Sequence, residues 1–169
     1  MRAATDAAFA SILASEREEA LVIELITYIS LAGTVNMAGG QPVSMANVRA
    51  LRELCDRYGI RIYLDATRMV ENCFFIQERE PGFEDRPVAA ILKEFCDYTD
   101  GAWMSAKKDN LVNIGGWLAV NDYDLFDQLR NMVVIYEGLH TYGGMAGRDM
   151  EALAIGIEEG VQDDHIRSR

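Results

Sequence analysis

Residues 44–65 read SMANVRALRELCDRYGIRIYLD, and this stretch predicts a helix that leads directly into a strand. Ser44 is a typical N-cap, and apolar residues recur at helical spacing until Gly59, a typical C-terminal stop. A strand pattern follows over residues 60–64 and ends at Asp65. The apolar, β-branched residues 26–31 predict a buried strand before the helix. This strand, helix and strand together have the length that a parallel crossover requires, which indicates an α/β fold.

Helix and strand patterns alternate along most of the chain, which predicts a mostly parallel sheet flanked by helices. The polar stretch 77–86, which contains proline and glycine, predicts an exposed loop. We expect the apolar stripe of the helix that follows it to belong to the core. Further strands are predicted at 101–105 and 116–120, and helices at 6–19, from Val88 to Phe95, from Asp122 through Val134 and around Met150 to Ile157.

The composition predicts one globular domain with a sizeable core, since 50% of the 169 residues are hydrophobic. A formal net charge of −11 has the wrong sign for binding nucleic acid or an anionic membrane. The longest apolar run, residues 21–33, is interrupted by Glu24 and is too short to span a membrane. No secretion signal is evident in the first 15 residues. We therefore expect a soluble, cytoplasmic protein that binds neither nucleic acid nor membrane.

The three cysteines, Cys55, Cys73 and Cys96, lie far apart in the sequence and form no CxxC pair. Their spacing favours a reducing, cytoplasmic setting. We expect each of them to be a small buried hydrophobic residue rather than a nucleophile.

Several polar residues lie at or just beyond the carboxyl ends of predicted strands, the edge at which open α/β sheets bind ligands. Asp65 closes an apolar strand, so its carboxylate needs a cation or a protonated ring nitrogen beside it. A structural ion pair with Arg68 would meet that need equally well. Lys107 and Lys108 are either a solvated loop pair or include a lysine that forms a Schiff base with an aldehyde cofactor. In pyridoxal phosphate (PLP) enzymes such a lysine is combined with an aspartate on the ring nitrogen.

Four motifs then occur in a fixed order. They are TVNMAGGQPVS at 34–44, DATR at 65–68 followed by Glu71-Asn72, SAKKD at 105–109 and YGGMAGRDM at 142–150. Together they resemble the aromatic amino-acid β-eliminating lyases, the family of the tyrosine phenol-lyases and tryptophanases. The resemblance runs from residue 28 to 164, and the VNIGG stretch at 112–116 is closer to the tyrosine phenol-lyases, whereas Ala106 is tryptophanase-like. It implies the central part of an aminotransferase-like, fold type I large domain within a single domain of residues 1–169.

The resemblance also implies roles for individual residues. Lys108 is similar to the Schiff-base lysine that also moves the α-proton, and Asp65 to the partner of the pyridinium nitrogen. Asn36 and Arg68 resemble the partners of the phenolic oxygen of PLP, and Ser105 a phosphate-binding serine. Three further positions match residues near the reacting centre: Lys107 as a neighbour that orders water, Tyr142 at the margin of the site, and Asn113 in a segment whose backbone helps to bind a monovalent cation such as potassium.

The implied reaction is the α,β-elimination of an aromatic amino acid, tyrosine or tryptophan, to phenol or indole, pyruvate and ammonia. The implied assembly is a homo-oligomer or an association with a complementary chain. Residues 1–24 do not match the family's phosphate loop, stacking aromatic residue and general-acid tyrosine, and no residue here matches its substrate-carboxylate arginine. We therefore expect weak PLP binding and little elimination by these 169 residues alone.

Two alternatives stay open at this point. The chain could be a non-catalytic α/β interaction module, or a decayed lyase fragment, that pairs with another subunit; the unmatched half-site and the acidic composition favour this. It could also be a PLP enzyme of the threonine aldolase type, which likewise uses an aspartate and a Schiff-base lysine. The Asn36 loop and Glu71-Asn72 favour the lyases over the aldolases.

Overall fold

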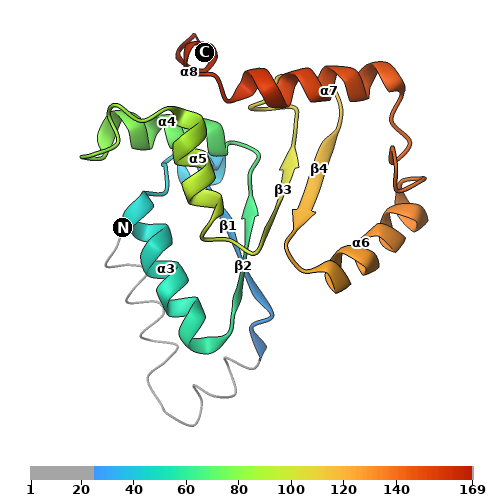
Figure 1. The fold of residues 1–169 in the computed structure, drawn as a ribbon, viewed down its shortest axis with the longest axis horizontal. Helices are drawn as coiled ribbons and strands as arrows, with labels where there is room; N and C mark the ends of the chain where they lie inside the picture. Colours follow the sequence, from blue (N-terminus) through green and yellow to red (C-terminus); the bar gives the residue numbers. More distant parts are fainter. Residues whose placement is uncertain (1–24, 169) are drawn as a thin grey trace.

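The computed structural model describes residues 25–168, so the helix predicted at residues 6–19 lies outside the described part. Four strands form one sheet in the order β1-β2-β3-β4, in which β1, β2 and β3 are parallel and β4 runs antiparallel to β3 (Figure 1). The prediction of a mostly parallel sheet is confirmed. The strands are β1 Tyr28–Ala32, β2 Arg61–Asp65, β3 Gly101–Ser105 and β4 Gly116–Val120.

Helices flank this sheet, and α3, α4 and α5 gather around its parallel part while α6 and α7 lie on the side of β4 (Figure 1). The helical elements are η1 Asn36–Ala38, α3 Met45–Tyr58, α4 Met69–Arg79, α5 Val88–Cys96, α6 Tyr123–Tyr136, α7 Gly147–Gly160 and α8 Asp163–Arg167. No helix among residues 25–168 is both long and apolar enough to cross a membrane.

The predicted helix ends are confirmed where local chemistry sets them. The Ser44 hydroxyl accepts a hydrogen bond from the Asn47 N–H at 3.1 Å, and Gly59 ends α3 in the left-handed conformation with φ of 65°. Asp122 caps α6 in the same way, accepting from the Leu125 N–H at 3.0 Å. Short-range side-chain capping is therefore sufficient to place these ends from the sequence.

The main core lies where α4 and α5 pack on the sheet. The apolar stripe of α5 is buried as predicted, with Val88, Ile91 and Phe95 all fully inside. The stripe of α7 is different, because Met150 and Ile157 are exposed in the part of the chain that the structure describes. The core is therefore concentrated at the parallel end of the sheet.

The prediction of an exposed loop over residues 77–86 is wrong at its beginning. Helix α4 continues to Arg79, and Gln77 is buried. Its side-chain amide donates to the Arg86 carbonyl at 2.8 Å and to Asp163 Oδ2 at 2.9 Å, so a polar residue is held inside by long-range partners. Phe83 is also buried and packs against the core, which fixes the middle of this segment.

The cysteines behave as expected of core residues. Cys55 and Cys73 are buried and Cys96 is half-buried. Burial raises the pKa of all three thiols, which disfavours the thiolate that a nucleophile requires.

Glu94 on α5 connects two helices electrostatically, and this predicts a pH effect. Burial acts to raise its pKa, but hydrogen bonds from Arg86, at 2.6 Å, and from Arg49 on α3 outweigh burial and lower the pKa below its ordinary 4.5. The contribution to stability is thus present above pH 4.5 and is lost as the pH falls through the folded-state pKa. We expect Glu94→Gln to lower the melting temperature at neutral pH and to converge with the parent in acid. A constant difference across the pH range would contradict this.

Candidate active site

The carboxyl ends of the three parallel strands lie at one edge of the sheet and carry most of the predicted site residues. Asp65 is the last residue of β2 and lies in register between Ala32 of β1 and Trp103 of β3. Asn36 begins η1 just after β1, and Ser105 ends β3. Lys107 and Lys108 occupy the turn that follows Ser105. The topology therefore brings segments that are far apart in the sequence to a common edge.

Thr67 connects the ends of β2 and β3. Its backbone N–H donates to Asp65 Oδ1 at 3.1 Å, which orients the half-buried carboxylate. Its side-chain oxygen accepts from the Ser105 N–H at 3.1 Å. One residue thereby fixes both the direction of the Asp65 carboxylate and the distance between the two strand ends.

The alternative ion pair between Asp65 and Arg68 is not formed among residues 25–168. Arg68 Nη1 instead lies 4.0 Å from Glu71 Oε2, at the limit of an ion pair. The backbone carbonyl of Arg68 accepts a 2.8 Å hydrogen bond from the buried Thr34 hydroxyl. Arg68 is therefore positioned through its backbone. Its guanidinium makes only a weak contact with Glu71, which a bound anion could replace.

The loop that carries Asn36 is anchored at its far end by Asn72. The Asn72 side chain is fully buried on α4; its amide oxygen accepts from the Val43 N–H at 2.8 Å and its amide nitrogen donates to the Val43 carbonyl at 2.9 Å. Gly33 lies against the same side chain, since a Cβ there would be 2.6 Å from Asn72 Oδ1. Asn36 itself is exposed between these two anchored ends.

The turn around Lys108 is compact and is attached to α4. The Leu111 N–H donates to the Lys108 carbonyl at 3.0 Å; Lys108 is half-buried, whereas Lys107 is exposed. Asp109 is fully buried, and its Oδ2 accepts from the Val70 N–H at 2.8 Å. A carboxylate next to the candidate Schiff-base lysine thus contacts the helix that begins just after Asp65 and Arg68.

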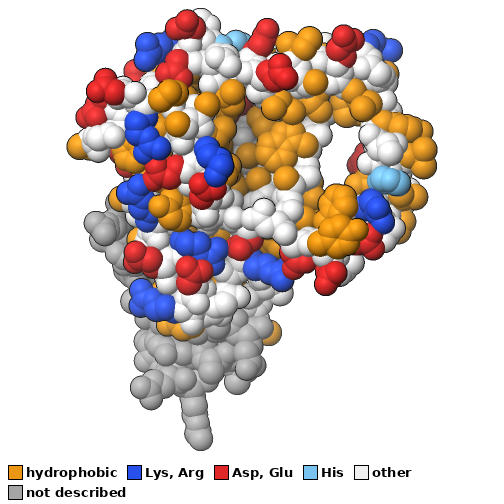
Figure 2. Space-filling model, in the orientation of Figure 1, with side chains coloured by type: hydrophobic (Ala, Val, Ile, Leu, Met, Phe, Trp, Pro, Cys, Tyr) orange, Lys and Arg blue, Asp and Glu red, His pale blue; other side chains and the backbone are white. Residues whose placement is uncertain are grey.

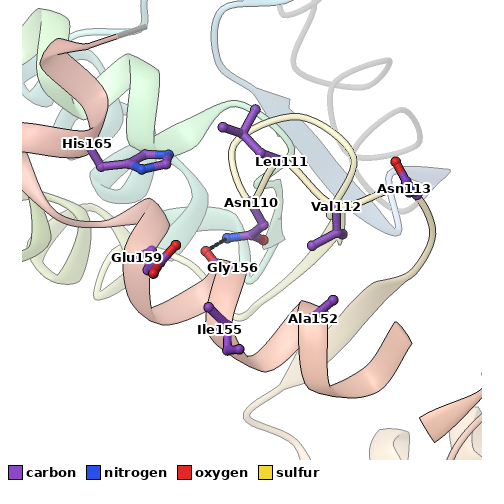
Figure 3. A pocket seen from close by; sticks show the side chains of 9 residues that line it. All are labelled: Asn110, Leu111, Val112, Asn113, Ala152, Ile155, Gly156, Glu159 and His165. Carbon is purple, nitrogen blue, oxygen red and sulfur yellow. Dashed lines mark hydrogen bonds between the residues drawn. The ribbon is translucent and has the colours of Figure 1, made fainter. Parts of the chain in front are cut away.

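Helix α7 packs closely on the residues that follow this turn. The Asn110 side-chain amide donates to the Gly156 carbonyl at 2.8 Å, and a Cβ on Gly156 would lie 2.5 Å from the Asn110 carbonyl oxygen. A cavity of about 420 Å³ lies beside this contact, with His165 and Glu159 facing the 110–113 loop (Figure 3). Asn113, the predicted cation-binding position, lines the cavity. Residues 25–168 contain no cluster of three or more metal-ligating His, Cys, Asp or Glu side chains.

Tyr142 is not brought to the strand-end edge by any hydrogen bond or ring contact within the described residues. It lies in the segment between α6 and α7, where the Tyr142 N–H donates to the Leu139 carbonyl at 3.2 Å. That segment runs on the far side of β4 from β1 and β2 (Figure 1). Its place at the margin of the site stays a prediction.

Two positioning groups were missed from the sequence. Thr67 and Asp109 lie inside the quoted motifs, but neither was selected as a site residue. Thr67 carried a usable signal, because an aspartate two residues before it predicts a side-chain to backbone turn. Asp109 carried none, since its partner Val70 is 39 residues away.

Comparisons with known proteins find similar sequences and a similar fold. The family model described as "Beta-eliminating lyase" matches residues 7–167, which includes most of the first 24 residues, where no resemblance was expected. Tyrosine phenol-lyase of Nostoc punctiforme is 70% identical over 146 residues, which are 86% of this chain and 31% of the relative. Tyrosine phenol-lyase of Intrasporangium calvum is 55% identical over 158 residues, which are 91% of this chain and 33% of the relative. The chain spans about a third of the length of the curated relatives that it matches.

The fold is shared with a solved structure from Exiguobacterium sp. 255-15, described as an aromatic amino acid β-eliminating lyase/threonine aldolase. The TM-score is 0.52 at 18% sequence identity, over 83% of this chain and 32% of that chain. This likeness concerns the fold, a mostly parallel sheet flanked by helices.

Proposed function

The chain belongs to the β-eliminating lyase family, and we propose that it supplies the cofactor-attachment part of a PLP-dependent lyase that eliminates phenol from tyrosine. The observation that carries this proposal is the common edge on which Thr67 joins Asp65 to Ser105, the residue after which the Lys108 turn begins. Identity to tyrosine phenol-lyases favours phenol over indole as the leaving group.

The side chains at this edge fit the polar groups of PLP. Asp65 is an oriented carboxylate that can accept the ring N–H, and Arg68 and Asn36 are donors suited to the phenolic oxygen. The Ser105 hydroxyl can donate to the phosphate, and the Lys108 amine can bond the aldehyde carbon. PLP, when bound, would supply an electron sink for the pair of electrons left when the α-proton is removed.

The residues of the chain would then move and hold protons around that sink. Lys108 Nζ would take the α-proton, and Asp65 would keep the ring nitrogen protonated. Lys107, exposed beside Lys108, would order water near the reacting carbon, and Tyr142 would lie at the margin of the substrate site. The Asn113 backbone would bind a monovalent cation such as potassium. The proposal includes a homo-oligomeric, cytoplasmic enzyme with tyrosine as substrate.

Lysine labelling tests the attachment site directly. Lys93, Lys107 and Lys108 are the only lysines in the sequence. PLP is added, borohydride reduces the C=N bond between the lysine nitrogen and the aldehyde carbon, and peptide mapping counts the label. We expect Lys108 to be labelled about tenfold more than Lys93, because a positioned amine reacts faster than a solvated one. Lys108→Ala should remove this preferred label and leave Lys93 unchanged. Equal labelling of the three lysines would overturn the proposal.

A second candidate function, a module that pairs with another chain, has one observation in its favour. Tyr123, Ile135 and Tyr136 of α6 are 74%, 69% and 75% exposed, and Figure 2 shows hydrophobic side chains over α6 and the neighbouring edge. Patches of this kind mark interaction surfaces. Association with another subunit, without preferential PLP labelling of Lys108, would favour this candidate.

We expect little phenol release from the 169 residues alone, since no residue matched here binds the substrate carboxylate.

A further inference from the structure

Asp109 caps a helix that it does not precede in the sequence. Helix α4 begins after Arg68, whose side chain makes no capping hydrogen bond. Asp109 Oδ2 takes that role, accepting from the Val70 N–H at 2.8 Å and approaching the Glu71 N–H at 3.4 Å. These N–H groups lie in the first turn of α4, where a helix has no internal acceptors and where the macrodipole favours a negative charge.

Hydrogen bonds on both sides of Lys108 join residues 103–109 to residues 66–70. Before Lys108, the two segments are joined by the Ala66 N–H to the Trp103 carbonyl, at 2.8 Å, and by the Ser105 N–H to Thr67 Oγ1, at 3.1 Å. After Lys108 they are joined by the carboxylate of Asp109. The lysine is therefore held on both sides to the segment that carries Asp65 and Arg68.

Burial makes the hydrogen bond between Asp109 and Val70 important, because a buried carboxyl group without a donor would be strongly destabilising. The Asp109 side chain has no exposed surface, so its carboxyl group is separated from water. Such a carboxylate is stable only where donors and positive charge replace its hydration, as they do at the start of α4. A shift of the turn by an ångström would therefore break a buried hydrogen bond that water cannot replace, and this cost resists movement of the turn.

We propose that Asp109 is a positioning residue that holds Lys108 in register with Asp65, so that the lysine nitrogen and the carboxylate meet opposite ends of the same bound ring. The inference rests on the proposed function, because positioning Lys108 matters only if Lys108 attaches PLP. It goes beyond that function in naming Asp109, a residue that does not react, as the one that positions the reacting Lys108.

Asp163 offers a matched control on the same scaffold. Its Oδ1 accepts from the Val88 N–H at the start of α5, at 2.9 Å, and its Oδ2 accepts from Gln77 Nε2, at 2.9 Å. It is another long-range carboxylate cap, but it attaches α8 rather than the Lys108 turn. Asp163→Ala should therefore cost stability in the same way without moving Lys108.

The experiment compares PLP labelling of the parent chain, Asp109→Ala, Asp109→Asn and Asp163→Ala, with circular dichroism and thermal unfolding on each. The label on Lys108 relative to Lys107 should fall about tenfold in Asp109→Ala, as expected for a displaced amine. Asparagine retains an acceptor oxygen of the same reach and is as good a cap, so Asp109→Asn should restore most of the ratio. Asp163→Ala should leave the ratio at the parent value.

Each outcome separates the two proposals. An unchanged ratio in folded Asp109→Ala, with Lys108 still preferred, overturns the positioning role and leaves the proposed function standing. No preference for Lys108 in the parent overturns the proposed function itself. If Asp109→Ala does not fold, Asp109→Glu replaces it: the longer carboxylate still protects the Val70 amide from hydrogen exchange while pushing the turn away. A lower Lys108 ratio in Asp109→Glu supports the inference, and an unchanged ratio contradicts it.

Discussion

Replacing Asn72 with alanine is expected to lower the free energy of unfolding by about 3 kcal/mol, because it removes a fully buried side chain and both of its hydrogen bonds to the partly buried Val43 backbone. The side chain of Asn72 is fully buried and pairs with both the N–H and the carbonyl of Val43. Alanine can replace neither bond. Urea denaturation measures the effect, which should appear as a lower midpoint with an unchanged slope.

The matched control is Asn131→Ala on α6. Its amide donates to the Asp127 carbonyl at 3.0 Å in an exposed position, so water can replace the lost bond and the change should stay within about 0.5 kcal/mol. Equal losses in the two variants would show that Asn72 does not anchor the loop. The Asn36 loop should also become more sensitive to proteolysis in Asn72→Ala alone, since its second anchor is removed.

Gly156→Ala should lower the free energy of unfolding by about 2 kcal/mol through overpacking. The added Cβ would lie 2.5 Å from the Asn110 carbonyl oxygen and 3.1 Å from Val112 Cγ1, so α7 or the 110–112 backbone must move. This effect opposes the gain in helix propensity that alanine usually brings, which is at most about 1 kcal/mol.

Gly147→Ala on the same helix isolates that propensity. No atom lies within 4 Å of a Cβ built at Gly147, and this position does not require a left-handed conformation. The variant should therefore be neutral or slightly more stable, opposite in sign to Gly156→Ala. Thermal unfolding measures the change in stability of both variants. A stability change of the same sign in both would contradict the close contact between α7 and the 110–112 loop.

Features set by neighbouring residues could be predicted from the sequence. The caps of α3 and α6 depend on Ser44 and Asp122, each within three residues of its partner, and the strands at 101–105 and 116–120 have the predicted bounds. Helix α4 was not predicted. Its first turn is capped by Asp109 and its buried Gln77 is paired with Asp163, so both signals come from distant parts of the chain.

The candidate site divides in the same way. Asp65 could be selected because a carboxylate at the end of an apolar strand is costly without a partner. Whether that partner was Arg68 could not be decided, because the choice depends on the start of α4, where Arg68 turns toward Glu71 instead. The residues that hold the site together, Thr34, Thr67 and Asp109, act across 34 to 39 positions and follow no local pattern.

The many distant partners of α4 also have a kinetic consequence. Its first turn and the preceding residue Arg68 are bonded to Thr34, Asp109 and Val43, through pairs separated by 29 to 39 residues. Such contacts form only after long loops have closed, and the parallel pairs β1–β2 and β2–β3 require the closure of loops of similar length. A domain whose sheet and site both depend on such distant partners is expected to fold slowly compared with a helical bundle of similar size. The edge proposed to attach the cofactor would therefore assemble only once the parallel strands have paired.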